Sequence, residues 1–228
     1  FVGTKGNNDI CKFLTKDTEK KFNTEVKKIN FENGVWALHT TESVIYSKAL
    51  VLTCPFPQSL KLLKKYLPRK IVKLNVKMIP IITLMIVFKS TRSFPINSIR
   101  INNNIIDKIT YENSKGRFKS NLSCWTIQTT SKFAKKIINK FKKKRDFYSL
   151  KIIKEFNKII GNNEKPLFSR IHGWKYAFNK NSTNMRSYWD PKKKLGLIGD
   201  WFIGPSVEDA WASAQDISKK IKKKTLLK

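Results

Sequence analysis

The sequence is poor in acidic residues, cysteine and histidine. Its 228 residues include 16 Asp and Glu against 47 Lys and Arg, which gives a formal net charge of +31 at pH 7. Cys11, Cys54 and Cys124 are odd in number and far apart. They indicate neither a disulfide framework nor a zinc site, so we expect a reducing, cytoplasmic compartment. His39 and His172 are the only histidines, so no His-based metal site is predicted and both rings are expected to be structural.

Long hydrophobic runs are also absent. No stretch of about 18 uncharged apolar residues occurs, so no membrane span is predicted. The most apolar stretch, Met78–Phe88, is too short, and Pro80 with the β-branched residues after it predicts a strand. Hydrophobic residues still make up 40% of the chain and aromatic residues 12%, which is enough for a folded core. The chain begins with Phe1, and no signal-peptide pattern follows, so we expect a segment cut from a longer protein.

The positive charge is mostly lysine, spread along the chain together with Asn and Ile. This composition is typical of drift in an AT-rich genome, and lysine on a solvated face is nearly neutral for the fold. The basic run Lys140–Arg145 is interpreted as a solvated helix end and turn. A nucleic-acid-associating protein stays an alternative, although that function favours clustered arginine with aromatic platforms.

Residue patterns predict the order of elements. The first part is expected to hold a helix over 7–15, strands over 25–30, 34–40 and 43–47 with a turn at 32–34, a strand buried on both faces over 49–54, and a helix over 58–65. The middle is expected to hold strands over 79–89 and 122–129, a polar Asn-rich stretch over 99–109, and helices over 132–140 and 146–160, the second ended by Gly161. The last part is expected to hold a strand over 168–172, a turn over 191–194, a strand over 195–200, a loop over 201–206 and a helix from 207 to about 220.

The end of the chain carries the strongest chemical pattern. A strand ends in Gly199-Asp200, a Gly-containing loop follows, and a helix opens with Val207-Glu208. Such a strand end aims a carboxylate into the crevice where α/β folds bind ligands. The helix start adds free N–H groups and a positive dipole end. A flavin suits this pair, because its ribityl hydroxyls can bond the carboxylate and its pyrimidine edge can face the helix.

The same segment resembles a known family. Leu197–Trp211, which reads Leu-Ile-Gly-Asp-Trp-Phe-Ile-Gly-Pro-Ser-Val-Glu-Asp-Ala-Trp, resembles the C-terminal FAD-binding segment of flavin-dependent amine oxidase-like proteins, and the renalase-like branch is the most similar. Further resemblances follow in family order, and they comprise residues 1–14, Glu25–Ile29 with Trp36–Leu38, Val51–Gln58, Trp125–Ser131 and His172–Ala177.

The resemblance implies an α/β fold with two parts. One is a FAD/NAD(P)-binding Rossmann-like domain, and the other is a mixed-sheet α+β substrate domain. Residues 1–65 are expected to form the middle part of the FAD-binding domain, residues 66–190 the substrate domain, and residues 191–228 the C-terminal part of the FAD-binding domain. The implied cofactor is FAD.

The resemblance also implies roles for individual residues. Asp200 would bond the ribityl chain, the Val207 N–H would face the flavin pyrimidine edge, and the Val26 backbone would meet adenine. The other expected cofactor-binding residues are Pro55, Gly199, Trp201, Glu208 and Ala210. The substrate side of the flavin would be lined by Trp125, Trp174 and Tyr176, with Trp201 and Trp211 packing near it, and ordinary core packing is the alternative for each aromatic residue. No catalytic residue is assigned, because the cofactor supplies the reactivity.

The implied activity is hydride transfer from a small reduced donor to FAD, followed by reduction of oxygen to hydrogen peroxide. The donor would be a dihydronicotinamide isomer or nucleotide, or an amine. A cofactor-less remnant of the same fold is the alternative within the family.

One family feature is missing. Such proteins open with Gly-x-Gly-x-x-Gly between a strand and a helix, and Gly3 with Gly6 does not match it. The first βαβ unit is therefore expected to be truncated, FAD retention to be poor, and this fragment alone to be inactive. Asp209 also stands where the family carries a small Gly, so close backbone approach there is in doubt.

Overall fold

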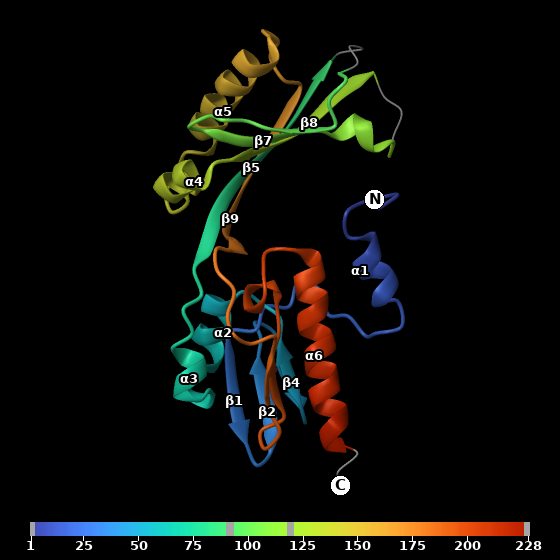
Figure 1. Ribbon diagram of the computed structural model, residues 1–228, viewed down its shortest axis with the longest axis vertical. Coiled ribbons are helices and arrows are strands. Elements are labelled where there is room, and N and C mark those ends of the chain that lie inside the picture. The colour runs from blue at the N-terminus through green and yellow to red at the C-terminus, as the bar shows by residue number, and fades with distance from the viewer. Residues whose placement is uncertain (1–2, 90–93, 118–120, 226–228) are drawn as a thin grey trace. The chain divides into compact units, whose positions relative to one another are not determined.

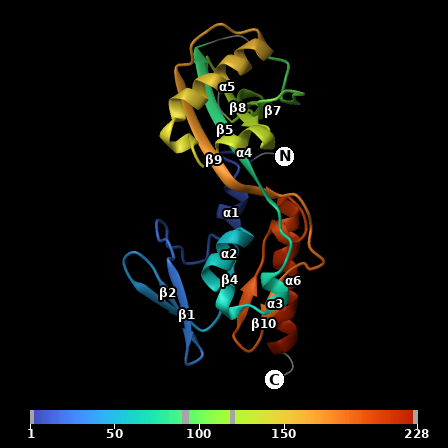
Figure 2. The same cartoon turned by 90° about the vertical axis from the view of Figure 1, so that its left-hand side faces the viewer.

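The computed structural model describes residues 3–89, 94–117 and 121–225, which form two compact units. Unit 1 joins the N-terminal residues through Glu19 to Ile79–Ala177, and unit 2 joins Lys20–Met78 to the chain from Phe178 onward. Figure 1 labels the elements, and Figure 2 gives a second view of each unit.

The first sheet of unit 2 is an antiparallel meander. It consists of β1 (Lys28–Glu32), β2 (Val35–His39) and β3 (Val44–Ser47). Asn33 and Gly34 connect β1 to β2 with φ angles of 51° and 77°. Two positive φ angles in a two-residue hairpin match the right-handed twist of the strands, which is why Asn-Gly is favoured there. The predicted turn is confirmed.

The second sheet of unit 2 contains a parallel pair of strands. Its order is β10 (Tyr188–Asp190), β11 (Leu195–Leu197) and β4 (Leu50–Leu52), with β11 parallel to β4 and antiparallel to β10. The expected parallel sheet is therefore confirmed. The expectation that the strand at 49–54 is buried on both faces is wrong, because β4 is an edge strand and Val51 is 38% exposed.

The helices of unit 2 pack against both sheets. They are α2 (Phe56–Leu63), η1 (Lys64–Tyr66), α3 (Arg69–Val72), η4 (Asp200–Phe202) and α6 (Val207–Thr225). Figure 2 shows α2 between the meander and the second sheet. One hydrophobic core joins both sheets with α2, α3 and η4, and its fully buried members include Trp36, Leu63, Ile71, Leu195, Leu197, Trp201 and Phe202.

Unit 1 is built on a five-stranded sheet. The order is β6 (Ser98–Arg100), β7 (Ile106–Tyr111), β8 (Leu122–Thr129), β5 (Met78–Lys89) and β9 (Phe168–Asn179). The helical elements are α1 (Asp9–Leu14), η2 (Glu112–Lys115), α4 (Ser131–Ile137), η3 (Phe141–Lys143) and α5 (Arg145–Ile160). The core lies between the sheet and the helices α4 and α5, where Phe133 and Phe156 meet Ile82 and Ile127.

Two helix signals in unit 1 follow elementary capping rules. The Thr130 side chain accepts a hydrogen bond from the Phe133 N–H (3.2 Å) and so begins α4. Gly161 ends α5 with a φ of 65°, and the Asn162 N–H donates to the Asn157 carbonyl (2.9 Å). The prediction that Gly161 ends this helix is confirmed.

The unit boundaries differ from the predicted domain boundaries. Leu67 and Ile71, expected in the substrate domain, are buried in the core of unit 2. Tyr188, also expected there, pairs with Leu197 in a sheet of unit 2. Residues 3–19, expected in the cofactor domain, belong to unit 1. Packing against a distant segment decides these cases, and local sequence carries little information about it.

Within the described residues, no helix combines the length and the apolar character that crossing a membrane requires. The described residues also contain no group of three or more His, Cys, Asp and Glu side chains that could hold a metal ion.

Candidate functional site

The parallel strands of unit 2 end at the same edge of their sheet. Leu50 pairs with Leu195 and Leu52 with Leu197, and the Ile198 N–H continues the ladder to the Leu52 carbonyl (3.0 Å). The chain therefore leaves both strands side by side. We call this region the carboxyl edge; it comprises 53–55 after β4, 199–201 after β11, and the start of α6. Open α/β folds bind ligands at such an edge.

Gly199 leads from β11 into the turn of η4 at the carboxyl edge, in an extended backbone conformation that favours glycine. Its φ of +155° lies in a region that side chains rarely adopt, and a Cβ there would lie 2.5 Å from Trp201 Nε1. Its buried N–H donates to Ser213 Oγ (3.1 Å), and that hydroxyl donates to the Arg186 carbonyl (2.6 Å). Ser213 thus attaches the turn to α6, a role that no sequence pattern indicates.

Asp200 places a carboxylate at the carboxyl edge. Its Oδ1 accepts a hydrogen bond from the Trp201 N–H (2.8 Å), and no cation forms an ion pair with it among the described residues. Burial raises the pKa of the Asp200 carboxyl, and the nearby Asp209 carboxylate raises it further, while backbone N–H groups act in the opposite direction. Asp200 is therefore a half-buried carboxylate that keeps unused acceptor capacity.

Trp201 and Phe56 bring the two segments of the carboxyl edge together. The Trp201 ring is fully buried, stacks on Phe202 with centroids 3.8 Å apart, and lies 4.9 Å from the Phe56 ring. Phe56 directly follows Pro55, which is the N-cap of α2. The Trp201 indole N–H has no hydrogen-bond acceptor within the described part of the chain. A buried donor without a partner is costly, so it needs an explanation.

The first turn of α6 is capped by its own residues. The Ser206 N–H donates to Asp209 Oδ2 (3.0 Å), and the Asp209 N–H donates to Ser206 Oγ (3.1 Å). This reciprocal pair satisfies two of the free donors at the helix start. The N–H groups of Val207 and Glu208 have no acceptor among the described residues, and Val207 is 73% exposed. The Ala210 N–H closes the turn onto the Ser206 carbonyl (3.3 Å).

Asp209 occupies a position where a glycine was expected, and there it forms hydrogen bonds that cap α6. Besides the Ser206 backbone, its Oδ2 accepts a hydrogen bond from Ser206 Oγ (2.7 Å). A Cβ on Gly204 would lie only 2.6 Å from the same oxygen, so Gly204 leaves room for the cap. The Ser-x-x-acidic spacing is readable in the sequence, and it is the signal that identifies this cap.

Val26 lies in unit 2, outside the two segments of the carboxyl edge. It stands two residues before β1 and packs half-buried against the core of unit 2. The next residue, Lys27, donates its N–H to the His39 carbonyl (2.8 Å). The meander that Val26 leads into is a different sheet from the one that ends before Asp200.

Trp125 lies inside unit 1, on the side of the sheet that the helices cover. It is 2% exposed, and its ring is 5.3 Å from the Phe156 ring of α5. Its indole N–H donates to Ser123 Oγ (2.7 Å). These contacts agree with the alternative of ordinary core packing.

Trp174 and Tyr176 face the other side of that sheet. A Cβ on the intervening strand residue Gly173 would collide with the Phe141 ring, so the odd-numbered positions of β9 face the helices. Neighbouring strand residues point to opposite faces, which puts Trp174 and Tyr176 on the opposite side from Trp125. Trp174 is 54% exposed. Trp125 therefore faces the helices, whereas Trp174 and Tyr176 lie on the other face of the sheet.

The polar groups of the carboxyl edge suit part of a flavin. An unpaired carboxylate at Asp200, the free indole N–H of Trp201 and the free N–H groups at the start of α6 can bind hydroxyl and carbonyl groups. These are the groups on the ribityl chain and the pyrimidine ring. The described residues contain no glycine-rich strand-to-helix loop of the kind that holds a pyrophosphate.

Comparison with known proteins adds evidence at the level of the fold. No family model matches the sequence. A protein described as a protoporphyrinogen oxidase from Exiguobacterium sp. 255-15 superposes with a TM-score of 0.70 at 15% identity, covering 98% of this chain and 52% of that chain. A mutant of putrescine oxidase superposes with a TM-score of 0.60 at 8% identity, covering 88% of this chain and 49% of that one. For cyclohexylamine oxidase from Brevibacterium oxydans the values are 0.53, 10%, 87% and 48%.

These similarities confirm the expected α/β fold class. The chain has the fold of these oxidoreductases, and it spans about half the length of the proteins it matches. At identities of 15% and below, the similarity establishes the fold and leaves activity and substrate to be argued from the residues.

Proposed function

We propose that the chain is about half of an FAD-dependent oxidoreductase of the amine oxidase type, from the renalase-like branch. The observation that carries the proposal is the carboxyl edge, where Asp200 and the start of α6 meet in one loop beside the end of β4. The fold shared with oxidoreductases and the resemblance of Leu197–Trp211 to a FAD-binding segment support the same conclusion.

Residues of unit 2 would hold the cofactor. The Asp200 carboxylate would accept hydrogen bonds from ribityl hydroxyls, and the Val207 N–H would donate to the pyrimidine edge of the flavin. Glu208 and Ala210 would shape the same turn of α6, and Val26 would meet adenine through its backbone. When bound, FAD would accept a hydride and pass its electrons to oxygen, giving hydrogen peroxide.

Other residues of the chain would shape the cofactor site or contact the substrate. Pro55, Gly199 and Trp201 would keep the backbone close to the ligand, and burial of Trp201 would exclude water from its N–H. Trp174 and Tyr176, which share a face of β9, would line the substrate side. Their aromatic faces suit a dihydronicotinamide ring by stacking or an amine by cation–π contact. A small reduced donor and oxygen are thus the proposed partners, in the reducing, cytoplasmic setting that three free cysteines favour.

The chain alone is expected to retain FAD poorly. Its described residues offer groups for the ribityl and pyrimidine parts, and none of the glycine-rich geometry that binds the pyrophosphate. The experiment therefore uses the protein expressed from its complete reading frame.

The test compares Asp200→Ala with the unaltered protein in titrations with FAD. We expect FAD to bind about tenfold more weakly in the variant, because a charged-group hydrogen bond contributes roughly 1.5–3 kcal/mol. Asp146→Ala is the matched control, since Asp146 is exposed in the first turn of α5 in unit 1. Unchanged FAD affinity in Asp200→Ala would refute the assigned role.

A further inference from the structure

Unit 1 contains an open pocket that the proposed oxidoreductase function does not use. It has a volume of about 530 Å³ and is lined by Asn104, Ile105, Lys132, Phe133, Lys136, Ile137, Phe147, Tyr148 and Lys151. The lining comes from the connection between β6 and β7 and from the helices α4 and α5. Clefts of about 300–1,000 Å³ are the usual size for small-ligand sites.

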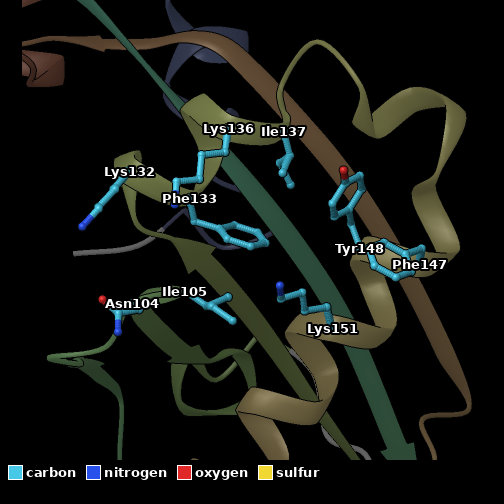
Figure 3. A pocket seen from close by; sticks show the side chains of 9 residues that line it. All are labelled: Asn104, Ile105, Lys132, Phe133, Lys136, Ile137, Phe147, Tyr148 and Lys151. Atoms are coloured by element: carbon cyan, nitrogen blue, oxygen red, sulfur yellow. The ribbon is translucent and has the colours of Figure 1, made fainter.

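The pocket is positively charged and has no internal neutralisation. Three of its nine lining residues are lysines and none is acidic. None of these lysines forms an ion pair among the described residues. Of the acidic residues near them on α5, Glu155 accepts a hydrogen bond from Asn103 Nδ2 (2.7 Å) and pairs with Lys158, and Asp146 is exposed in the first turn. Figure 3 shows the Lys151 ammonium directed into the pocket beside the Phe133 ring, and the Lys132 ammonium directed away from that ring.

One of the aromatic rings that line the pocket is exposed enough to stack against the ring of a ligand. Phe133 is 8% exposed and carries the Lys151 ammonium 5.8 Å above its ring centroid. Phe147 is 60% exposed and meets Tyr148 edge to face, with centroids 5.2 Å apart. A large aromatic residue exposed to this extent, beside a cationic cavity, offers a stacking surface.

The Asn104 side chain adds a polar group to the lysines and aromatic rings that line the pocket. The Asn104 backbone carbonyl accepts a hydrogen bond from Thr130 Oγ1 (3.0 Å), while the Asn104 side-chain amide has no partner among the described residues. A side-chain amide can donate one hydrogen bond and accept another, and the edge of a nucleobase carries both acceptors and donors.

We propose that this pocket binds a free nucleoside 5′-phosphate. The base would stack on the Phe147 and Tyr148 rings with its edge toward Asn104, and the phosphate would lie between the ammonium groups of Lys136 and Lys151. Lysine is a point charge that suits phosphate, whereas planar carboxylates favour the arginine fork. The volume of about 530 Å³ accommodates a single nucleotide, and a strand would need a basic groove that continues beyond it.

The test is calorimetric titration of UMP into the 228-residue chain at about 50 mM salt. UMP is chosen because it lacks the adenine of FAD, so the result is independent of the proposed cofactor site. We expect a dissociation constant below about 1 mM for UMP. Uridine, which lacks the phosphate, should bind at least about tenfold more weakly.

Two pairs of substitutions locate the site. The double variant Lys136→Gln/Lys151→Gln should weaken UMP binding about tenfold, whereas Lys142→Gln/Lys143→Gln should change it less than about twofold. Both pairs remove two charges from exposed positions of unit 1. Phe147→Ala should weaken binding about threefold, with the similarly exposed Phe168→Ala as its control.

Several results would overturn the proposal. They are no measurable UMP binding, equal binding of uridine and UMP, or equal losses from both lysine pairs. A single-stranded oligonucleotide that binds more tightly than UMP and loses affinity equally with both pairs would assign the effect to the general positive charge instead.

Discussion

The polar residues of the carboxyl edge are held in costly states. The Trp201 indole N–H is buried and finds no acceptor among the residues that the structure describes, the pKa of Asp200 is raised by burial, and Gly199 has a positive φ. Groups of this kind tend to collect where a ligand later satisfies them. Sequence alone could identify Gly199 and Asp200 as a pair, because the strand-to-helix pattern surrounds them. The unsatisfied state of Trp201 depends on packing against Phe56 and could not be predicted.

The raised pKa of Asp200 predicts a pH-dependent effect on stability. The folded state binds this proton more tightly than the unfolded state, so stability falls as pH rises through the unfolded and then the folded pKa. Asp200→Asn should therefore raise the urea midpoint of unfolding at pH 7. This gain in stability over the unaltered chain should disappear at a pH below both the unfolded and the folded pKa of Asp200. A variant less stable than the unaltered chain at pH 7, measured without ligand, would contradict the cause assigned to the shift.

Gly199→Ala should destabilise unit 2 strongly. The substitution combines a φ of +155° with a Cβ 2.5 Å from Trp201 Nε1, and we expect a loss of about 2–3 kcal/mol in urea unfolding. Gly34→Ala is the control, since its φ is +77° and no atom lies within 4 Å of the added Cβ. Equal losses at both glycines would mean that the contact with Trp201 has no effect.

At the scale of elements, strong local signals could be predicted from the sequence and irregular ones could not. The strand 122–129 has the predicted bounds, and α5 ends at Gly161 as predicted. The strand β7 (Ile106–Tyr111) begins within the stretch 99–109 that is expected to be polar and Asn-rich. The strand was missed because a register shift between Ile106 and Lys108 breaks its alternation. The sequence also does not indicate which face of a strand packs against the helices, as the position of Trp125 shows.

The cap of α6 gives an element-scale prediction. Asp209→Ala removes the acceptor of the Ser206 N–H and should cost about 1 kcal/mol. It should also bring the pKa of Asp200 closer to its ordinary value, because the Asp209 carboxylate contributes to raising it. Glu208→Ala is the control, since Glu208 is exposed and outside the capping pair. Thermal unfolding of both variants measures the first effect; equal stability would argue against the cap.

At the scale of the whole molecule, the net charge of +31 by itself favours a nucleic-acid partner, whereas the fold is shared with proteins of another kind. The fold is that of oxidoreductases, and the charge is spread over solvated lysines. The Debye length is about 8 Å at physiological ionic strength, so exposed charges act over short distances. The length of the chain is more informative than its charge, because the chain spans about half the length of the proteins it matches.

The diffuse charge predicts binding to DNA without sequence preference. Dissociation constants for a short duplex should lie in the non-specific range of about 10⁻⁴–10⁻⁶ M and rise steeply with salt. Fluorescence anisotropy with several unrelated duplexes measures this directly. A preference of about 1,000-fold or more for one sequence would indicate a dedicated nucleic-acid function instead.

The central proposal is that this chain is part of an FAD-dependent oxidoreductase. The most direct measurement is the visible absorbance spectrum of the protein expressed from its complete reading frame, before and after incubation with FAD and removal of the unbound cofactor. The account predicts a yellow protein with a bound-flavin spectrum that is bleached by a dihydronicotinamide or an amine and returns in air. A folded protein that stays colourless after incubation with FAD would contradict it.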